Sequence, residues 1–450
     1  MCGLVGSYRD NQFAIEKRLS LIGHRGPDSR GFVEIDGVMH GHVRLALLDL
    51  SSAADQPFKY KGAILAFNGE IWNHQEIRKE LGGKFKTGSD TETLAAALYQ
   101  WGIDALSRLE GMFAFSWSHG GYNILARDRF GKIPLYINRS GETFRWSSER
   151  KGLAPYTCTQ LPAGTWLDLE TGKVSRWYSI PREWQKVVDI GARLEDGVRA
   201  RLLADAPLCC LISGGLDSSM ILAYAKKHKR DIVAYTARLD HDSHDLINAR
   251  RVADHFEVPL TEVDIGQISA GALTRAAMVI EIPSKAQIEI AALCIPLAQA
   301  ISSDGFKACL SGEAADELFG GYGSMCIKGA RASDNEWRNI RLQQIDKMAR
   351  GNFVRCNKAF MAYGIECRLP FMDRALVEGV VNLRKADCPP GKKALKKAAS
   401  GIIPESVIKR PKDTFQGGSG VSREAAKVIS NPGRFYRAEI KKIYGKSAIN

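Results

Sequence analysis

The sequence Leu211-Ile212-Ser213-Gly214-Gly215-Leu216-Asp217-Ser218-Ser219 connects a short apolar run to a segment typical of a helix. Residues 207–212 predict a buried strand, and residues 220–227 predict the first turns of a helix. The turn between them is rich in glycine and serine. Glycine allows a ligand close to the backbone, and the N–H groups at a helix N-terminus bind anions. The stretch therefore predicts a phosphate site.

Asp217 would repel a phosphate, so we expect Mg²⁺ between the carboxylate and the phosphate. For a bare Gly-Gly pair, an ordinary turn capped by small residues would be the better interpretation. The full run is more specific, and it resembles the pyrophosphate-binding loop of ATP pyrophosphatases, which cut ATP between the α and β phosphates. The resemblance implies that ATP is bound by Leu211, Ser213, Gly214, Gly215, Asp217, Ser218 and Ser219.

Strand and helix patterns alternate after this loop. Strands are expected at 231–237, 260–265 and 307–311, and helices at 248–256 and 286–303. Such alternation predicts a parallel sheet, in which ligands bind beyond the carboxyl ends of the strands. The loop that opens at Ser311 would lie there, beside the phosphate loop. Beyond Gly320 the chain is expected to be mainly helical.

The first 180 residues have a different pattern. Short apolar runs separated by turn residues predict many strands, with helices at 13–22, 73–81 and 90–107. This favours two layers of sheet covered by helices. An amphipathic helix at 184–204 would lead into the phosphate loop. With 450 residues the chain has room for both units, and we place them at 2–182 and 183–450.

The composition, 45% apolar and 25% charged, is that of a soluble globular protein. We find no apolar run long enough to span a bilayer, and the N-terminus lacks the features of a secretion signal. The ten cysteines are scattered without the spacing of metal ligands. A reducing cytoplasm is the expected compartment, with no membrane association.

The net charge of +13 is concentrated near the C-terminus, where residues 380–450 hold 16 Lys and Arg against 5 Asp and Glu. An anionic partner such as nucleotide phosphates would explain this, and so would a solvated basic face. A nucleic acid would also fit but is not favoured.

Cys2 follows the initiator methionine directly. If Met1 is removed, Cys2 carries a thiol and a free α-amine, whose pKa is about 7.7–8.0 in reference peptides, so the amine can act as a base. A thiolate activated by an adjacent base is a nucleophile suited to acyl transfer. Taken alone, an incidental cysteine at this position would be the better interpretation.

Further residues supply a matching pocket. Asn68-Gly69 offers an amide and a backbone N–H for an oxyanion hole, Arg44 can bind a carboxylate in a bidentate manner, and Asp90 can pair with an ammonium group. A ligand with an α-carboxylate, an α-ammonium and a side-chain amide is glutamine. Each residue singly has an equally good structural explanation, and only the joint pattern favours this site.

Several short motifs together resemble the class II, N-terminal-nucleophile glutamine amidotransferase domain. They are Cys2-Gly3, His24-Arg25-Gly26-Pro27-Asp28, Arg44-Leu45, Asn68-Gly69-Glu70-Ile71, Gly88-Ser89-Asp90 and Arg127-Asp128. With the phosphate loop and Ser311-Gly312-Glu313-Ala314-Ala315-Asp316-Glu317, residues 2–425 resemble the glutamine-hydrolysing asparagine synthetases. The resemblance implies an αββα sandwich of antiparallel sheets followed by a Rossmann-like parallel-sheet domain with a helical C-terminal part.

The resemblance also implies roles. Cys2 would attack glutamine to form a thioester, Asn68 and Gly69 would stabilise the oxyanion, and ammonia would pass through a tunnel between the domains. Glutamine would be held by Arg44, Asn68, Glu70 and Asp90. In the second domain Ser311 and Gly312 would join the ATP site, Asp217 and Asp316 would hold Mg²⁺, Glu313 would act at the acyl-adenylate, and Lys412 would stabilise pyrophosphate. Arg368, Asp373 and Lys392 match further family positions. Paired subunits are usual in the family, so a homodimer is expected.

One segment departs from the family pattern. Where asparagine synthetases carry Thr-Thr-x-Arg, associated with aspartate binding, this chain has Ala286-Gln287-Ile288-Glu289. A glutamate reverses the charge of the arginine, so either Lys285 or Arg275 binds aspartate instead, or the acceptor is another acid. The chain is also shorter than the usual bacterial enzyme.

The sequence thus predicts a glutamine-dependent, ATP-using amide ligase that makes asparagine, AMP and pyrophosphate from aspartate. Two alternatives stay open. The same chemistry could act on another carboxylic acid, on a modified base, a peptide or a small molecule, or the chain could be a binding protein with an inactive synthetase site.

Overall fold

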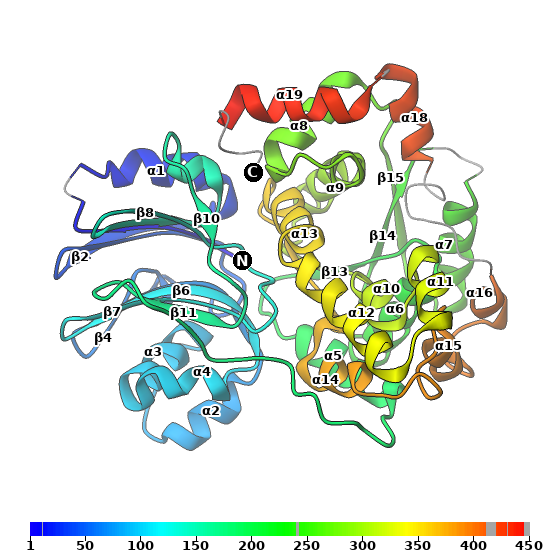
Figure 1. Cartoon of the computed structure of the whole chain (residues 1–450), viewed down its shortest axis with the longest axis horizontal. Coiled ribbons are helices and arrows are strands. Elements are labelled where there is room, and N and C mark those ends of the chain that lie inside the picture. Colours follow the sequence, from blue (N-terminus) through cyan, green and yellow to red (C-terminus); the bar gives the residue numbers. More distant parts are fainter. Residues whose placement is uncertain (11, 240–242, 411–419, 430, 445–450) are drawn as a thin grey trace.

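The computed structural model describes residues 1–450 apart from residues 11, 240–242, 411–419, 430 and 445–450. Figure 1 shows two halves side by side, a sandwich of two sheets on the left and a larger α/β half on the right. The N-terminus lies at the junction between them. The first residues of the chain are therefore in contact with both halves.

The left half consists of two six-stranded sheets in which all neighbouring strands are antiparallel. The first sheet has the order β10 (Thr159–Gln160), β8 (Tyr136–Ser140), β9 (Thr143–Ser147), β1 (Gly3–Tyr8), β3 (Val38–Arg44) and β2 (Ser29–Ile35). The second has the order β12 (Val174–Arg176), β11 (Thr165–Asp168), β7 (Tyr122–Arg127), β6 (Gly111–His119), β5 (Ala63–Ile71) and β4 (Phe58–Tyr60).

Helices cover the outer faces of both sheets (Figure 1). Helix α1 (Ile15–Ile22) packs on β1 and β3, and α2 (His74–Leu81), α3 (Asp90–Trp101) and α4 (Ala105–Arg108) lie on the side of the second sheet. The predicted αββα sandwich is confirmed. The predicted helix 90–107 is interrupted because Gly102, with φ of +57°, ends α3.

Strand β5 illustrates why the apolar runs in this half are nearly continuous. All nine of its residues are buried, because one face of the strand meets the other sheet and the opposite face meets α3. Polar contacts also cross between the sheets. His40 on β3 is bonded to Ser116 and Ser118 on β6 at 2.8 Å each, and His42 is bonded to the carbonyl of Phe67 at 2.9 Å.

The right half is built on a parallel sheet with the order β15 (Leu260–Asp264), β14 (Ala234–Arg238), β13 (Leu208–Leu211), β16 (Ala308–Leu310) and β17 (Glu366–Arg368). From β13 the chain first adds strands on one side and then returns to add β16 and β17 on the other. The carboxyl ends of β13 and β16 therefore lie side by side at the point where the order reverses, which is where open α/β sheets bind ligands.

The helices of this half confirm the alternating pattern and the helical C-terminal part. Before β16 they are α5 (Ile190–Arg201), α6 (Leu216–His228), α7 (His244–His255), α8 (Ala270–Ile280) and α9 (Lys285–Ser303). After it come α10 (Ala315–Phe319), α11 (Gly323–Arg331), α12 (Asp334–Met348), α13 (Asn352–Met361), α14 (Arg374–Val381), α15 (Lys393–Ala399), α16 (Glu405–Lys409), α18 (Val421–Val428) and α19 (Pro432–Tyr444).

Two helix starts differ from the prediction because capping residues set them. Helix α5 begins later than expected, after Asp189, whose side chain accepts a hydrogen bond from the N–H of Ala192 at 2.9 Å. Helix α7 begins earlier than expected, after Ser243, which caps Leu246 at 3.3 Å. A side-chain oxygen at such a position satisfies an N–H group that has no partner within the helix.

Helix α9 has the length and the apolar composition of a membrane span, contrary to the expectation that no such run exists. It packs against α8, α13 and β14, and residues such as Ile288, Leu293 and Ile301 are buried in the core. Its apolar character is explained by this packing.

Residues 177–189, between β12 and α5, connect the two halves, and within them only Gln185 forms a bridge, to Leu383. Polar contacts join the halves directly. Tyr178 donates to Glu378 at 2.9 Å, and Lys307 pairs with Asp28 at 2.7 Å. The boundary at 182/183 stays a prediction.

The buried histidines make the stability of the fold depend on pH. Burial lowers the pKa of His40 and of His42 to about 3, whereas histidine in an unfolded chain titrates near about 6.5. As the pH falls below 6.5 the unfolded chain takes up protons that the folded chain does not, so the free energy of unfolding decreases.

We expect His40→Gln to lose less stability than the wild type between pH 6.5 and 4, in denaturant unfolding at several pH values. The exposed His255, changed to Gln, is the matched control, and parallel curves for all three proteins would contradict the assignment.

Candidate active site

Cys2 lies immediately before β1, at the junction of the two halves, and is buried. Its N–H donates to Oδ1 of Asn68 at 2.9 Å, and its Sγ accepts from the N–H of Leu45 at 3.4 Å. Asn68 is fixed in turn by Ser148, to which its Nδ2 donates at 3.2 Å. The structure therefore brings Cys2 and Asn68 together, as the sequence predicted.

Burial raises the pKa of the Cys2 thiol to about 11, although the neighbouring ammonium group and the N–H of Leu45 act in the opposite direction. The protonated thiol is a weak nucleophile. A base next to the sulfur is needed for acyl transfer at neutral pH, which is the role that a free α-amine on Cys2 would fill.

Glu70 and Asp90 are buried on adjacent elements, β5 and α3, and Asp90 accepts from the N–H of Ile71 at 2.8 Å. Burial raises the pKa of Glu70, and the nearby carboxylates of Glu366 and Asp90 raise it further. Burial likewise raises the pKa of Asp90 to about 6. Two buried carboxyl groups with raised pKa values favour a bound cation, and the ammonium group of an amino acid is a suitable one.

Gly69, between Asn68 and Glu70, has φ of +149°, and a Cβ here would lie 2.0 Å from the carbonyl oxygen of Met112. Only glycine fits. Arg44, predicted to bind the carboxylate of glutamine, is already occupied, since Nη1 donates to the carbonyl of Ser51 at 2.7 Å and to Asp55 at 2.8 Å. Arg44 therefore holds the 49–55 loop in this structure, and a ligand carboxylate would have to share it with Asp55.

Residues of the second half also reach this pocket, which the sequence did not reveal. Glu366 on β17 pairs with the ammonium of Met1 at 2.5 Å and with Arg368 at 2.7 Å, and Arg368 lies 3.8 Å from Glu70. Although burial alone would raise the pKa of Glu366, the two cations hold it below its ordinary value. Arg368 was noted as matching a family position, but its strand was not expected beside the predicted glutamine pocket.

The phosphate loop follows β13 as predicted. Gly215 precedes the first turn of α6, and the N–H of Ser213 donates to Oγ of Ser218 at 3.2 Å. Gly214 has φ of +67°, and a Cβ there would lie 2.4 Å from the backbone of α7. Gly312, after β16, packs on the start of α6, where a Cβ would lie 2.9 Å from the N–H of Ser218. The loops after β13 and β16 are therefore in direct contact.

Asp217 and Asp316, the predicted metal ligands, are brought together around a lysine. The ammonium of Lys392 pairs with Asp316 at 2.5 Å and also with Asp217. Burial would lower the pKa of Lys392, but the two carboxylates raise it above its ordinary value. In the described part of the chain no group of three or more His, Cys, Asp or Glu side chains could hold a metal ion. Two carboxylates still fit Mg²⁺, which typically binds one or two carboxylates and completes its shell with phosphate and water.

Glu313 is held by groups that the sequence analysis missed. Its Oε1 accepts from Asn352 at 2.9 Å, and Arg355 forms an ion pair with its Oε2. The thiol of Cys356 lies 3.4 Å from the same carboxylate. All three partners lie on α13, so this helix fixes the position of Glu313. The predicted Lys412 lies outside the described residues.

The segment that departs from the family pattern forms the first turns of α9. Glu289 is fully buried and accepts from the hydroxyl of Ser422 on α18 at 2.8 Å. Gln287 instead accepts from Arg355 at 2.9 Å and donates to Asn352 at 2.8 Å. Of this segment, Gln287 therefore lies beside the residues that hold Glu313, and Glu289 packs toward the C-terminal helices.

Lys285 and Arg275, the two residues suggested to bind aspartate in place of the family arginine, have other partners. Lys285 is half-exposed and lies 3.7 Å from Glu289, and Arg275 donates to the hydroxyl of Tyr363 at 2.6 Å. The guanidinium beside Glu313 belongs to Arg355. Arg355 lies in the middle of a helix, and nothing in the sequence distinguishes it there from an arginine on the protein surface.

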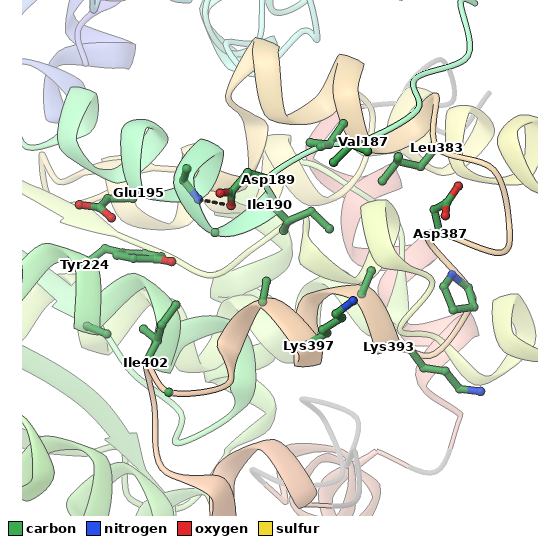
Figure 2. A pocket seen from close by; sticks show the side chains of 18 of the residues that line it. Val187, Asp189, Ile190, Glu195, Tyr224, Leu383, Asp387, Lys393, Lys397 and Ile402 are labelled. Carbon is green, nitrogen blue, oxygen red and sulfur yellow. Dashed lines mark hydrogen bonds between the residues drawn. The ribbon is translucent and has the colours of Figure 1, made fainter.

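A small cavity lies beside the site, and a larger one lies away from it. A small buried one of about 10 Å³, lined by Met1, Met112, Cys356 and Cys367 among others, lies at the junction of the halves. Figure 2 shows a much larger one, about 1030 Å³, between α5, α6 and α15, with Tyr224 and Lys397 in its lining. None of the predicted site residues that the structure describes lines the larger cavity, so its volume is no guide to the chemistry.

The tight packing of Gly214 can be tested with Gly214→Ala. The new methyl group would strain the backbone, at about 1–3 kcal/mol, and push against α7, so we expect ATP to bind at least tenfold more weakly in calorimetry. Gly266→Ala is the matched control, since Gly266 has a similar φ of +65° with open space around it. The control should lose stability without losing ATP affinity. Unchanged ATP affinity in Gly214→Ala would contradict the assignment.

Comparison with known proteins agrees with this geometry. A family model for a glutamine amidotransferase domain matches residues 1–171, and one for asparagine synthase matches residues 189–343 and 324–431. The chain is 32% identical over 466 residues to asparagine synthetase B (glutamine-hydrolysing) of Escherichia coli strain K12, covering 94% of this chain and 83% of that protein. It is 31% identical over 470 residues to the glutamine-hydrolysing asparagine synthetase of Asparagus officinalis, covering 94% and 78%.

A solved structure of the glutamine phosphoribosylpyrophosphate amidotransferase from B. subtilis, 17% identical, covers 93% of this chain and 95% of its own with a TM-score of 0.37, which is too low to support an argument. The two matched families and the identity along almost the whole chain are decisive. This chain belongs to the family of glutamine-hydrolysing asparagine synthetases.

Proposed function

We propose that this protein is a glutamine-dependent amide ligase. Glutamine is hydrolysed at Cys2, an acid is adenylated with ATP at the 213–219 loop, and ammonia attacks the adenylate to give the amide, AMP and pyrophosphate. Aspartate is the leading acceptor. The observation that carries the proposal is that Cys356 on α13, whose thiol lies 3.4 Å from the carboxylate of Glu313, lines the same small cavity as Met1, next to Cys2, so the two sites meet at one junction.

The first half-reaction follows from the surroundings of Cys2. The thiol loses its proton to the α-amine that removal of Met1 would free, and the sulfur attacks the glutamine amide carbon. The side-chain amide of Asn68 and the N–H of Gly69 stabilise the oxyanion. Glu70 and Asp90 hold the substrate ammonium group, and Arg44 holds its carboxylate. The protonated α-amine returns its proton to the amide nitrogen, the carbon–nitrogen bond breaks, and ammonia leaves the thioester behind. Water then releases glutamate from the thioester.

The second half-reaction uses the loops after β13 and β16. The N–H groups and hydroxyls of the serines in residues 213–219 bind the phosphates of ATP, with Ser311 and Gly312 beside them. Mg²⁺ held by Asp217 and Asp316 would neutralise phosphate charge. Glu313 accepts the proton that ammonia loses when it attacks the adenylate, and Lys392 and Lys412 balance negative charge on the phosphates.

A second candidate acceptor is favoured by one observation. The family arginine associated with aspartate is replaced by Glu289, whose carboxylate is directed to Ser422. An acid other than aspartate would explain this exchange, whereas aspartate requires another cation, for which Arg355 is the candidate.

We further propose a domain boundary at 182/183, a cytoplasmic location and a homodimer. All ten cysteines are free thiols, in keeping with a reducing compartment.

The nucleophile is tested by Cys2→Ala. We expect glutamine hydrolysis to fall at least a thousandfold, because the thioester cannot form, while amide synthesis from added ammonium salt stays within about twofold of wild type. Glutamate release and amide formation are measured separately, and intact mass spectrometry establishes whether Met1 is removed. Normal hydrolysis by the variant, or a purified protein that is active and retains Met1, would contradict the proposal.

The acceptor is tested by ATP–pyrophosphate exchange with a panel of acids. Exchange should require an acid, because pyrophosphate is released only when the adenylate forms. Aspartate is expected to stimulate it most, and Arg355→Met should abolish that stimulation. No stimulation by aspartate combined with stimulation by another acid would favour the second candidate, and no exchange with any acid would contradict ligase activity.

A further inference from the structure

A buried ion pair at the junction of the halves is not used by the proposed chemistry. Glu281 follows α8 in the left-handed conformation, with φ of 57°, and pairs with Lys358 on α13. Both side chains have no exposed surface. Burying two charges is costly unless hydrogen bonds satisfy their remaining groups. The surroundings of this pair therefore indicate what it holds.

The partners of Glu281 come from the glutaminase half. Its Oε2 accepts from the backbone N–H of Arg150 at 2.8 Å, and its Oε1 accepts from the backbone N–H of Lys151 at 2.9 Å. Lys358 also donates to the hydroxyl of Tyr136 on β8 at 3.0 Å. One carboxylate and one ammonium of the synthetase half thus bind three groups of the glutaminase half.

The segment that Glu281 holds is itself connected to the nucleophile. Glu149, next to Arg150, pairs with Arg25 at 2.8 Å, and Nε of Arg25 donates to the carbonyl of Cys2 at 2.9 Å. Arg25 and Glu149 are both buried. Residues 149–151 are therefore linked to the backbone of Cys2 through the side chain of Arg25. They are linked to the synthetase half through the backbone N–H groups of Arg150 and Lys151.

Lys358, the other member of the ion pair, is connected through α13 to the residues around Glu313. Lys358 lies one turn beyond Arg355 and Cys356 on α13, and Asn352 begins that helix. Arg355 and Asn352 are the residues that hold Glu313. Since a helix of ten residues moves as a unit, a shift of Lys358 displaces the partners of Glu313.

We infer that Glu281 is a positioning residue that couples the two half-reactions, an inference that rests on the proposed function. Through Arg150 and Lys151 it fixes the glutaminase segment behind Cys2, and through Lys358 it fixes the helix that holds Glu313. The coupling keeps the junction between the sites closed to water, so that ammonia formed at Cys2 reaches the adenylate before it is protonated or lost.

The test is Glu281→Gln, which keeps the shape of the side chain. Its amide has a single oxygen acceptor and no charge, so it cannot satisfy both N–H groups and balance Lys358. Three rates are measured: glutamine hydrolysis in the presence of ATP and acceptor, amide formation driven by glutamine, and amide formation driven by ammonium salt. We expect the ratio of glutamate released to amide formed to rise at least fivefold above wild type, while ammonia-driven synthesis stays within about threefold.

Glu257→Gln is the matched control, because Glu257 also has a positive φ, of 52°, at the end of a helix, but is exposed. It should keep the wild-type ratio. Tyr136→Phe removes only one hydroxyl contact of Lys358 and should raise the ratio about twofold. If Glu281→Gln does not fold, the Tyr136→Phe ratio decides the question.

The outcomes separate this inference from the proposed function. A wild type that neither hydrolyses glutamine nor uses ammonia would overturn the function itself. If the wild type is active and the ratio of glutamate released to amide formed is unchanged in Glu281→Gln and in Tyr136→Phe, only the role of Glu281 is overturned. Equal losses of all three rates in Glu281→Gln would show a structural role and overturn the coupling role as well.

Discussion

A carboxylate that is removed from water must find cations, and Glu366 at the junction of the two halves meets this constraint with two of them. It lies on the edge strand of the parallel sheet, yet its partners include the ammonium group at the start of the other half. Arg368, two residues further along the same strand, extends this network to Glu70 in the proposed glutamine pocket. Because none of these charges can be left alone at low dielectric, they hold the two halves in one arrangement in the chain that retains Met1.

The same principle organises the nucleotide side. Asp217 and Asp316 lie in the first turns of different helices, α6 and α10, and the single ammonium of Lys392 pairs with both, which leaves one net negative charge. Gly312 allows the loop after β16 to touch the start of α6, and Gly214 allows the loop after β13 to touch α7. Backbone conformation and charge balance thus place the two loops at the same edge of the sheet, and the chemistry we propose follows from that edge.

The sequence predicted the parts that depend on local pattern. The 213–219 loop and the strand-helix alternation were predicted, because turn chemistry and apolar periodicity are written in neighbouring residues. The contact of Cys2 with Asn68 joins residues far apart in the sequence, and it was expected from the family resemblance. Arg355, Asn352 and Glu281 were missed because their roles depend on contacts across long stretches of chain. Glu289 shows the same limit: its charge was visible in the sequence, but only the fold reveals that it is directed to α18 while Gln287 lies beside Arg355.

Met1 is almost completely buried, with its ammonium paired to Glu366 and its sulfur 2.9 Å from Nδ2 of Asn357. An aminopeptidase can act only while the N-terminus is accessible. Removal of Met1, which would expose the Cys2 amine, therefore has to come before the right half folds around it. Glu366 is made more than 360 residues after Cys2. At ribosomal speeds of about 5–20 residues per second this leaves on the order of 20–70 seconds. If Cys2 is the nucleophile that we propose, its maturation depends on timing during synthesis, and a chain that folds before Met1 is removed would keep Met1 buried beside Glu366.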